Sequence, residues 1–178
     1  MDKRNGISTR TIVTVGMFTA VLSVLSILTI PMPSGVPVTL QTFAVALCGY
    51  VLGAKKGTCA TLIHILIGTV GVPVFAGMMA GPSRLFGYTG GFIWGFLFLV
   101  ALCGLAMRQK KVILRIGLGM VGLAVCHLIG VIQYSIVAES QLMAAFVTVS
   151  LPYIIKDVLM VVGAYLVAVP VRKNLISL

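Results

Sequence analysis

The sequence predicts an all-α integral membrane protein, a single transmembrane domain of six helices whose two ends lie on the cytoplasmic side. Hydrophobic residues fill 60% of the 178 positions, and the mean hydropathy of +1.16 is too high for a soluble domain. Uncharged stretches recur that match the roughly 20 residues needed to cross a bilayer. The 13 basic and 3 acidic residues fall mostly in short clusters between these stretches.

The spans follow from the positions of the uncharged stretches. A Pro/Gly-rich segment at 31–37 divides the first long stretch into two spans, and basic clusters separate most of the others. The first stretch lacks a small-residue cleavage site, so it is predicted to be a span and not a signal peptide. The six spans are predicted at residues 11–30, 38–54, 57–75, 88–107, 112–138 and 151–171.

The orientation follows from the basic clusters. With an even number of spans, the N-terminus, the second and fourth loops and the C-terminus lie on one side, and these segments hold all but two of the basic residues. The positive-inside rule makes that side cytoplasmic. Short, regularly spaced clusters without an aromatic-polar groove exclude a nucleic-acid-binding surface. The clustered residues are Lys3, Arg4, Arg10, Lys55, Lys56, Arg108, Lys110, Lys111, Arg115, Arg172 and Lys173.

Two charges lie inside the last apolar stretch. Ionisable groups within a span are costly and usually face the bundle interior or a wet cavity, so Asp157 is a candidate for binding a ligand N–H group or a cation. Lys156 is its neighbour, but adjacent helical residues point about 100° apart, so the two are not expected to pair. The alternatives are a structural hydrogen bond for Asp157 and an interfacial position for Lys156.

The loop before the fourth span carries a further candidate group. It contains Phe75, several glycines and Arg84, and is expected to act as a mobile lid over a site. A guanidinium there can hold a ligand carboxylate through two hydrogen bonds, or alternatively a lipid phosphate.

The start of the fourth span is rich in glycine and aromatic residues. Gly90 and Gly91 allow close approach of backbones and expose backbone polar groups, which is tolerated at membrane depth only beside protein or a cavity. Tyr88 and Phe92 offer flat apolar faces, although Tyr88 also suits an interfacial aromatic belt.

Two further pairs of candidate residues lie in the first two spans. Thr39 and Gln41 open the second span, and the Gln41 amide suits either a polar ligand or a neighbouring helix. Gly16 and Ala20 form a small-xxx-small pattern in the first span, which suits close packing within the protein or against a partner helix.

The remaining reactive residues give no catalytic or metal-binding pattern. His64 and His127 are expected to be satisfied core residues, and Cys48, Cys59, Cys103 and Cys126 to be small buried residues. The sequence has no P-loop, no HExxH and no paired carboxylates, so an enzyme is not predicted.

Five segments together resemble the BioY family, the biotin-specific S components of energy-coupling factor vitamin transporters. The resemblance covers nearly the whole chain and is carried, in order, by residues 37–45, 49–57, 68–77, 87–96 and 152–157. It implies a six-helix bundle in a bacterial plasma membrane. It also implies a biotin pocket near the outer face and partnership with a membrane coupling subunit and two ATP-binding-cassette ATPases. No cofactor is expected besides the ligand.

The resemblance also implies roles for the candidate residues. Asp157, Gln41 and Thr39 would bond the polar ring of biotin, Phe75, Tyr88 and Phe92 would form apolar walls, and Arg84 would hold the carboxylate. Gly16 and Ala20 would dock on the coupling subunit. The sequence departs from the family at Met160, where a Lys is usual, and at Lys156, which replaces Gly, so Lys156 or Arg84 would supply the positive charge. The alternatives are an S component for another vitamin, a membrane enzyme or a scaffold.

Overall fold

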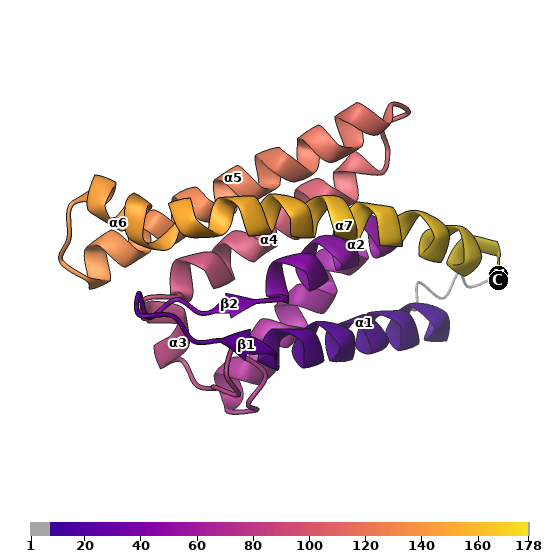
Figure 1. The fold of residues 1–178 in the computed structure, drawn as a ribbon. Coiled ribbons are helices and arrows are strands. Elements are labelled where there is room, and N and C mark those ends of the chain that lie inside the picture. Colours follow the sequence, from indigo (N-terminus) through magenta and orange to yellow (C-terminus); the bar gives the residue numbers. More distant parts are fainter. Residues whose placement is uncertain (1–7, 178) are drawn as a thin grey trace.

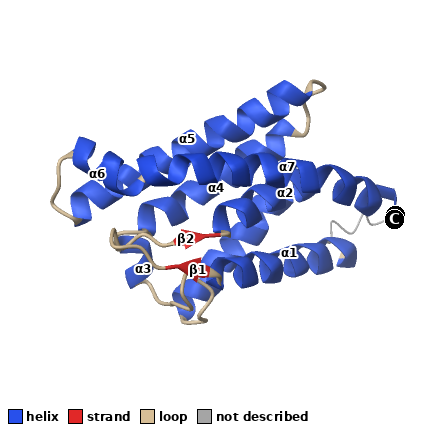
Figure 2. Ribbon diagram, in the orientation of Figure 1, coloured by secondary structure: helices blue, strands red, loops and turns tan. Residues whose placement is uncertain are grey.

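The computed structural model describes residues 8–177, with side chains through Asn174, and is mostly helical, as predicted (Figure 1). Long helices lie alongside one another, and a two-stranded antiparallel hairpin that was not predicted lies at one end (Figure 2). The elements are α1 (Thr9–Ile27), β1 (Thr29–Ile30), β2 (Val38–Thr39), α2 (Gln41–Val70), α3 (Ser83–Phe86), α4 (Gly90–Ala106), α5 (Val112–Val137), α6 (Leu142–Val149) and α7 (Leu151–Ser177).

Four of the described helices are long and apolar enough to cross a membrane: α1, α2, α5 and α7 as far as Asn174. Helix α4 is also apolar but shorter. The sequence prediction instead had six spans, and the difference lies in α4 and in the internal structure of α2.

Helix α2 consists of two arms that fold back on each other at Gly53. This residue has φ = 79° and ψ = 172°, outside the helical region and accessible mainly to glycine. Gln41 and His64 would be about 34 Å apart in a continuous helix, yet Gln41 Nε2 lies 3.4 Å from His64 Nε2. The arms, residues 41–52 and 54–70, therefore run antiparallel.

Small residues let the central helices pack closely. A Cβ added at Gly95 of α4 would lie only 2.7 Å from Cys126 Cα on α5. Around this contact lies a core of buried side chains from α1, α2, α4, α5 and α7, including Tyr50, Leu99 and Val161. Three of the cysteines are buried as predicted, but Cys59 is exposed on the outer side of α2.

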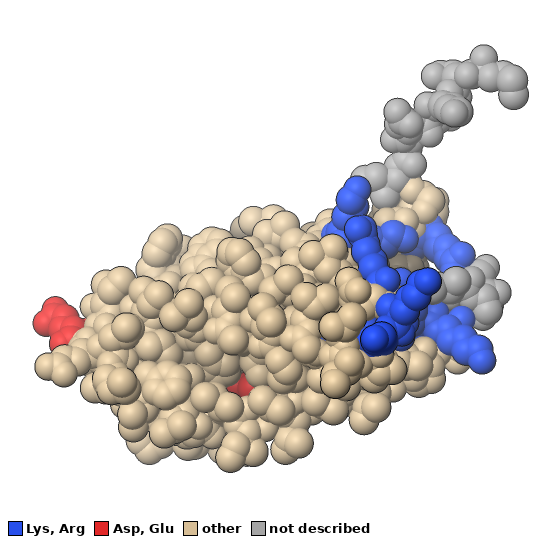
Figure 3. Space-filling view, turned by 90° about the horizontal axis from the view of Figure 1, so that it is seen from above, with Lys and Arg blue, Asp and Glu red and all other residues tan. Residues whose placement is uncertain are grey.

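Basic side chains gather at one end of the molecule, whereas the acidic atoms visible in the same view lie at the other end and within the body (Figure 3). One of the basic side chains also makes structural contacts at this end. Arg172 Nη1 donates to the carbonyl oxygens of Tyr50 and Val51, each at 3.1 Å, and so satisfies the last carbonyls of the first α2 arm. The predicted cytoplasmic residues Lys3 and Arg4 lie outside the described residues.

The opposite end is closed by two connections. The α1–α2 connection is fastened to α5 and α7: the Tyr134 hydroxyl donates to the Ser34 carbonyl at 3.3 Å, and the Tyr153 hydroxyl donates to the Val36 carbonyl at 2.5 Å. In the α2–α4 connection, the Leu85 carbonyl accepts from Gln133 Nε2 of α5 at 2.8 Å. These two connections form the roof of an internal cavity.

Candidate ligand-binding site

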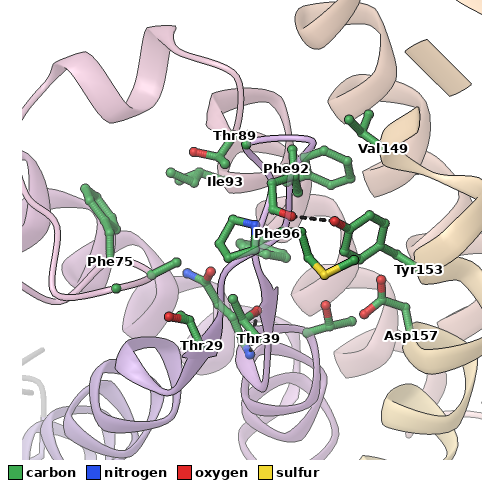
Figure 4. Close-up of a pocket in the computed structure, with 18 of the residues that line it drawn as sticks. Thr29, Thr39, Phe75, Thr89, Phe92, Ile93, Phe96, Val149, Tyr153 and Asp157 are labelled. Carbon is green, nitrogen blue, oxygen red and sulfur yellow. Dashed lines mark hydrogen bonds between the residues drawn. The ribbon is translucent and has the colours of Figure 1, made fainter. Parts of the chain in front are cut away.

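A cavity of about 260 Å³ lies beneath the two roof connections (Figure 4). It is lined by the α1–α2 hairpin, the start of α2, the α2–α4 loop, one side of α4 and α5, and the first turns of α7. Its volume is near the lower end of the usual range for small-molecule sites, roughly 300–1,000 Å³. Its walls include Phe75, Phe92 and Phe96, so they are largely apolar with a few polar groups between.

Asp157 is the buried acid of this cavity, with 6% of its surface exposed. His127 Nε2 of α5 lies 3.3 Å from its Oδ2, and His127 Nδ1 lies 2.8 Å from Ser150 Oγ. A neutral imidazole can satisfy both contacts if Nε2–H faces the carboxylate and Nδ1 accepts from the Ser150 hydroxyl. The carboxylate is thus oriented from a neighbouring helix.

Lys156 does pair with Asp157, contrary to the prediction from helical angles. Lys156 Nζ lies 2.6 Å from Asp157 Oδ1 and donates to the Thr39 carbonyl at 3.3 Å. The long side chain bends back toward its neighbour, which Cα directions alone do not reveal. Both carboxylate oxygens are therefore engaged, Oδ2 with His127 and Oδ1 with Lys156. Each carboxylate oxygen has two lone pairs, so the carboxylate retains acceptor capacity beyond these two contacts.

Gln41 is the second fixed polar group. Its Nε2 lies 3.4 Å from His64 Nε2, and His64 Nδ1 lies 2.9 Å from Ser23 Oγ on α1. All three side chains are buried, and Gln41 also lines the cavity. The amide is thus held from behind by two other helical segments.

The structure brings most of the predicted site residues together. Their side chains or backbones come from four separate parts of the chain and face one cavity. The Thr39 hydroxyl in addition accepts from the backbone N–H of Gln41 at 3.2 Å. The predicted residues that line the cavity are Thr39, Gln41, Phe75, Arg84, Phe92, Lys156 and Asp157.

Three predicted residues are not among those that line the cavity. Tyr88 is 48% exposed and its ring lies 5.4 Å from that of Tyr134 on the outside of the roof. Gly90 and Gly91 are buried against other backbone: added Cβ atoms would meet the Leu85 carbonyl and the Ile129 carbonyl, respectively. These glycines serve the close packing of α4 and do not face the site.

Sequence reasoning missed His127 and Tyr153, which both line the cavity. His127 was expected to be a core residue because it has no acidic or Cys neighbour one turn away. Its partner Asp157 is on another helix, so no local spacing could identify it. Ser150, the residue before α7, directs its hydroxyl to His127.

The small-residue pattern on α1 lies on the surface of the protein. Gly16 and Ala20 are both exposed, and an added Cβ at Gly16 would meet nothing within 4 Å. Large apolar side chains surround them on the same helix, including Met17 and Val24. No group of three metal-ligating side chains was found in the described part of the chain.

Comparisons with known proteins agree with these observations. A family model described as the BioY family matches residues 1–177. The "Biotin transporter BioY" of Thermotoga maritima is 33% identical over 165 residues, which cover 92% of this chain and 96% of that protein. The protein of the same description from Rhodobacter capsulatus is 32% identical over 173 residues, covering 89% and 91%.

A solved structure shares the fold. The crystal structure of the S-component for biotin from an ECF-type ABC transporter matches with a TM-score of 0.82. The match covers 95% of this chain and 94% of that chain at 23% identity. From the family model and the identity along nearly the full length of its relatives, the chain belongs to the BioY family.

Proposed function

We propose that this chain is the substrate-binding membrane subunit of a biotin uptake system. It binds biotin at the outer face of the membrane and delivers it inward with an ATP-driven coupling module. The observation that carries the proposal is the buried Asp157 carboxylate, which lines the cavity together with His127 and Lys156. The relatives, whose names are those of biotin transporters, support the same ligand.

The chemistry of biotin suits this cavity. Its ureido ring offers N–H donors, and a carboxylate acceptor in a dry site makes the stronger, charge-assisted kind of hydrogen bond. Asp157, Gln41 and Thr39 bind the polar ring, and Phe75 and Phe92 enclose the apolar part. Arg84, at the roof, holds the carboxylate. Tyr88, Gly90 and Gly91 support the walls from outside and make no direct contact with the ligand.

The proposed topology has six spans and both termini in the cytoplasm. The antiparallel arms of α2 and the helix α4, added to α1, α5 and α7, supply six segments. The gathering of basic side chains at the end remote from the cavity supports placing that end in the cytoplasm. The cavity then opens toward the outer face of a bacterial plasma membrane.

The proposed partners are a membrane coupling subunit and two ATP-binding-cassette ATPases, which supply the energy, so this chain is a transport subunit and not an enzyme. The exposed Gly16 and Ala20 support docking through α1, because small residues let a second helix approach closely. The solved relative is likewise described as a component of an ECF-type ABC transporter.

Titration calorimetry of the purified protein in detergent tests the ligand. Biotin is expected to bind with a stoichiometry of one, whereas riboflavin and thiamine are expected to give no binding heat. Heat with another vitamin and none with biotin would contradict the proposal and make the chain an S component of different specificity.

A further inference from the structure

A chain of buried hydrogen bonds leads from α1 to the cavity. The Ser23 hydroxyl donates to the Thr19 carbonyl at 2.9 Å and also lies 2.9 Å from His64 Nδ1. On the other side of the ring, His64 Nε2 lies 3.4 Å from Gln41 Nε2. His64 is 1% exposed and Gln41 5% exposed, so water does not compete for these bonds.

The donors and acceptors in this chain fit together in one direction. Gln41 Nε2 can only donate, so His64 Nε2 accepts from it. In a neutral imidazole the other nitrogen then carries the proton, so His64 Nδ1–H donates to Ser23 Oγ, and the single Ser23 proton goes to the Thr19 carbonyl. The NH₂ end of the amide is thereby turned toward His64, and its carbonyl oxygen Oε1 is left for the cavity.

We infer that Ser23 and His64 are positioning residues that hold Gln41 as a hydrogen-bond acceptor and so make the site selective for a ligand N–H. The inference rests on the proposed function and deepens it. The Asp157 carboxylate, held separately by His127 and Lys156, supplies a second acceptor from a different helix. A cyclic urea has two N–H groups, so it matches two such acceptors, whereas a ring without one N–H leaves an acceptor buried and unpaired.

The test compares Ser23→Ala with Ser26→Ala. Ser26 is a matched control because it lies on the same helix, is fully buried, and donates to the Leu22 carbonyl at 2.7 Å. Without Ser23 Oγ, Nδ1–H loses its acceptor, the ring proton moves to Nε2, and Gln41 turns its carbonyl toward His64. The variants are titrated with biotin and with its two mono-N-methylated ureido derivatives.

The wild-type protein is expected to bind biotin far more tightly than either methylated derivative. Ser23→Ala is expected to weaken biotin binding roughly tenfold, by the cost of one unmade hydrogen bond. Its affinity for one of the two derivatives is expected to stay unchanged, so the discrimination at that nitrogen falls by the same factor. Ser26→Ala is expected to keep the wild-type discrimination. His64→Phe, which retains a ring of similar shape beside Phe75, is expected to behave like Ser23→Ala.

The results separate the inference from the proposed function. If wild-type protein does not bind biotin, the proposed function itself fails. If it binds biotin, but Ser23→Ala and His64→Phe weaken all three ligands equally or match Ser26→Ala, the positioning role is wrong. Equal losses would mean that the chain of hydrogen bonds only stabilises the fold.

Discussion

Two basic side chains hold Asp157: His127 on α5 and Lys156 on its own helix. Removing the charge of such an acid from water costs several kcal/mol unless the carboxylate is paired. The ion pair and the His127 contact compensate part of that cost, and the further lone pairs of the two oxygens keep acceptor capacity. We expect this arrangement to stabilise the carboxylate in its apolar surroundings and to leave it able to bind a ligand.

At this scale, Asp157→Asn is expected to weaken biotin binding by about 2 to 4 kcal/mol, or roughly 30- to 1,000-fold, because the charge-assisted bond is lost in a dry site. Calorimetry measures the affinity. Glu139→Gln is the control, since Glu139 is the exposed acid after α5, and its affinity is expected to match that of the wild type. Unchanged binding by Asp157→Asn would remove Asp157 from the site.

The sequence alone identifies some of these residues and not others. Asp157 is evident because a lone acid in an apolar stretch requires a reason. His127 and Ser150 are not evident, because their contacts join residues 23 or more positions apart through the packing of helices. The pairing of Lys156 with Asp157 depends on a side-chain rotamer, which no spacing rule describes.

At the scale of the elements, the turn within α2 shows which features the sequence reveals and which it does not. The basic pair Lys55 and Lys56 indicates that the chain turns nearby, but not which residue turns it. Gly53 does so because its positive φ is costly for residues with a Cβ. The hairpin β1–β2 was not predicted either, because two-residue strands are too short for any alternation of polar and apolar residues to appear.

The packing of α4 on α5 can be tested at Gly95. Gly95→Ala is expected to destabilise the protein by about 1–3 kcal/mol, because the added methyl would overlap Cys126. The measurement is the thermal unfolding of the purified protein in detergent. Gly117→Ala is the matched control: it lies on α5 with nothing within 4 Å of the added Cβ. It is expected to be neutral or stabilising by up to about 1 kcal/mol. Equal melting temperatures for the two variants would contradict the packing account.

At the scale of the whole molecule, charge and cavity lie at opposite ends. The α1–α2 and α2–α4 connections that close the cavity are poor in basic residues, while the turn at Gly53, the α4–α5 loop and the end of α7 are rich in them. For a molecule with this asymmetry, the positive-inside rule predicts insertion with the basic end in the cytoplasm. The distribution of charge was readable from the sequence, although the depth and shape of the cavity were not.

The orientation can be measured by labelling introduced cysteines in intact cells with a membrane-impermeant thiol reagent. Glu139→Cys, in the exposed turn between α5 and α6, is expected to react from outside. Lys110→Cys, in the α4–α5 loop, is expected to react only after the membrane is permeabilised. The parent protein, with its native cysteines, gives the background. The reverse pattern would invert the proposed topology.

The contact of Arg172 with Tyr50 and Val51 also limits how the chain can be handled. Because this side chain satisfies the end of the first α2 arm, the last turns of α7 are part of the folded core and not a dispensable tail. A chain shortened before Arg172 would leave two carbonyls beside the Gly53 turn without that donor. Fusion partners and affinity tags therefore belong beyond this residue, with the whole of α7 retained.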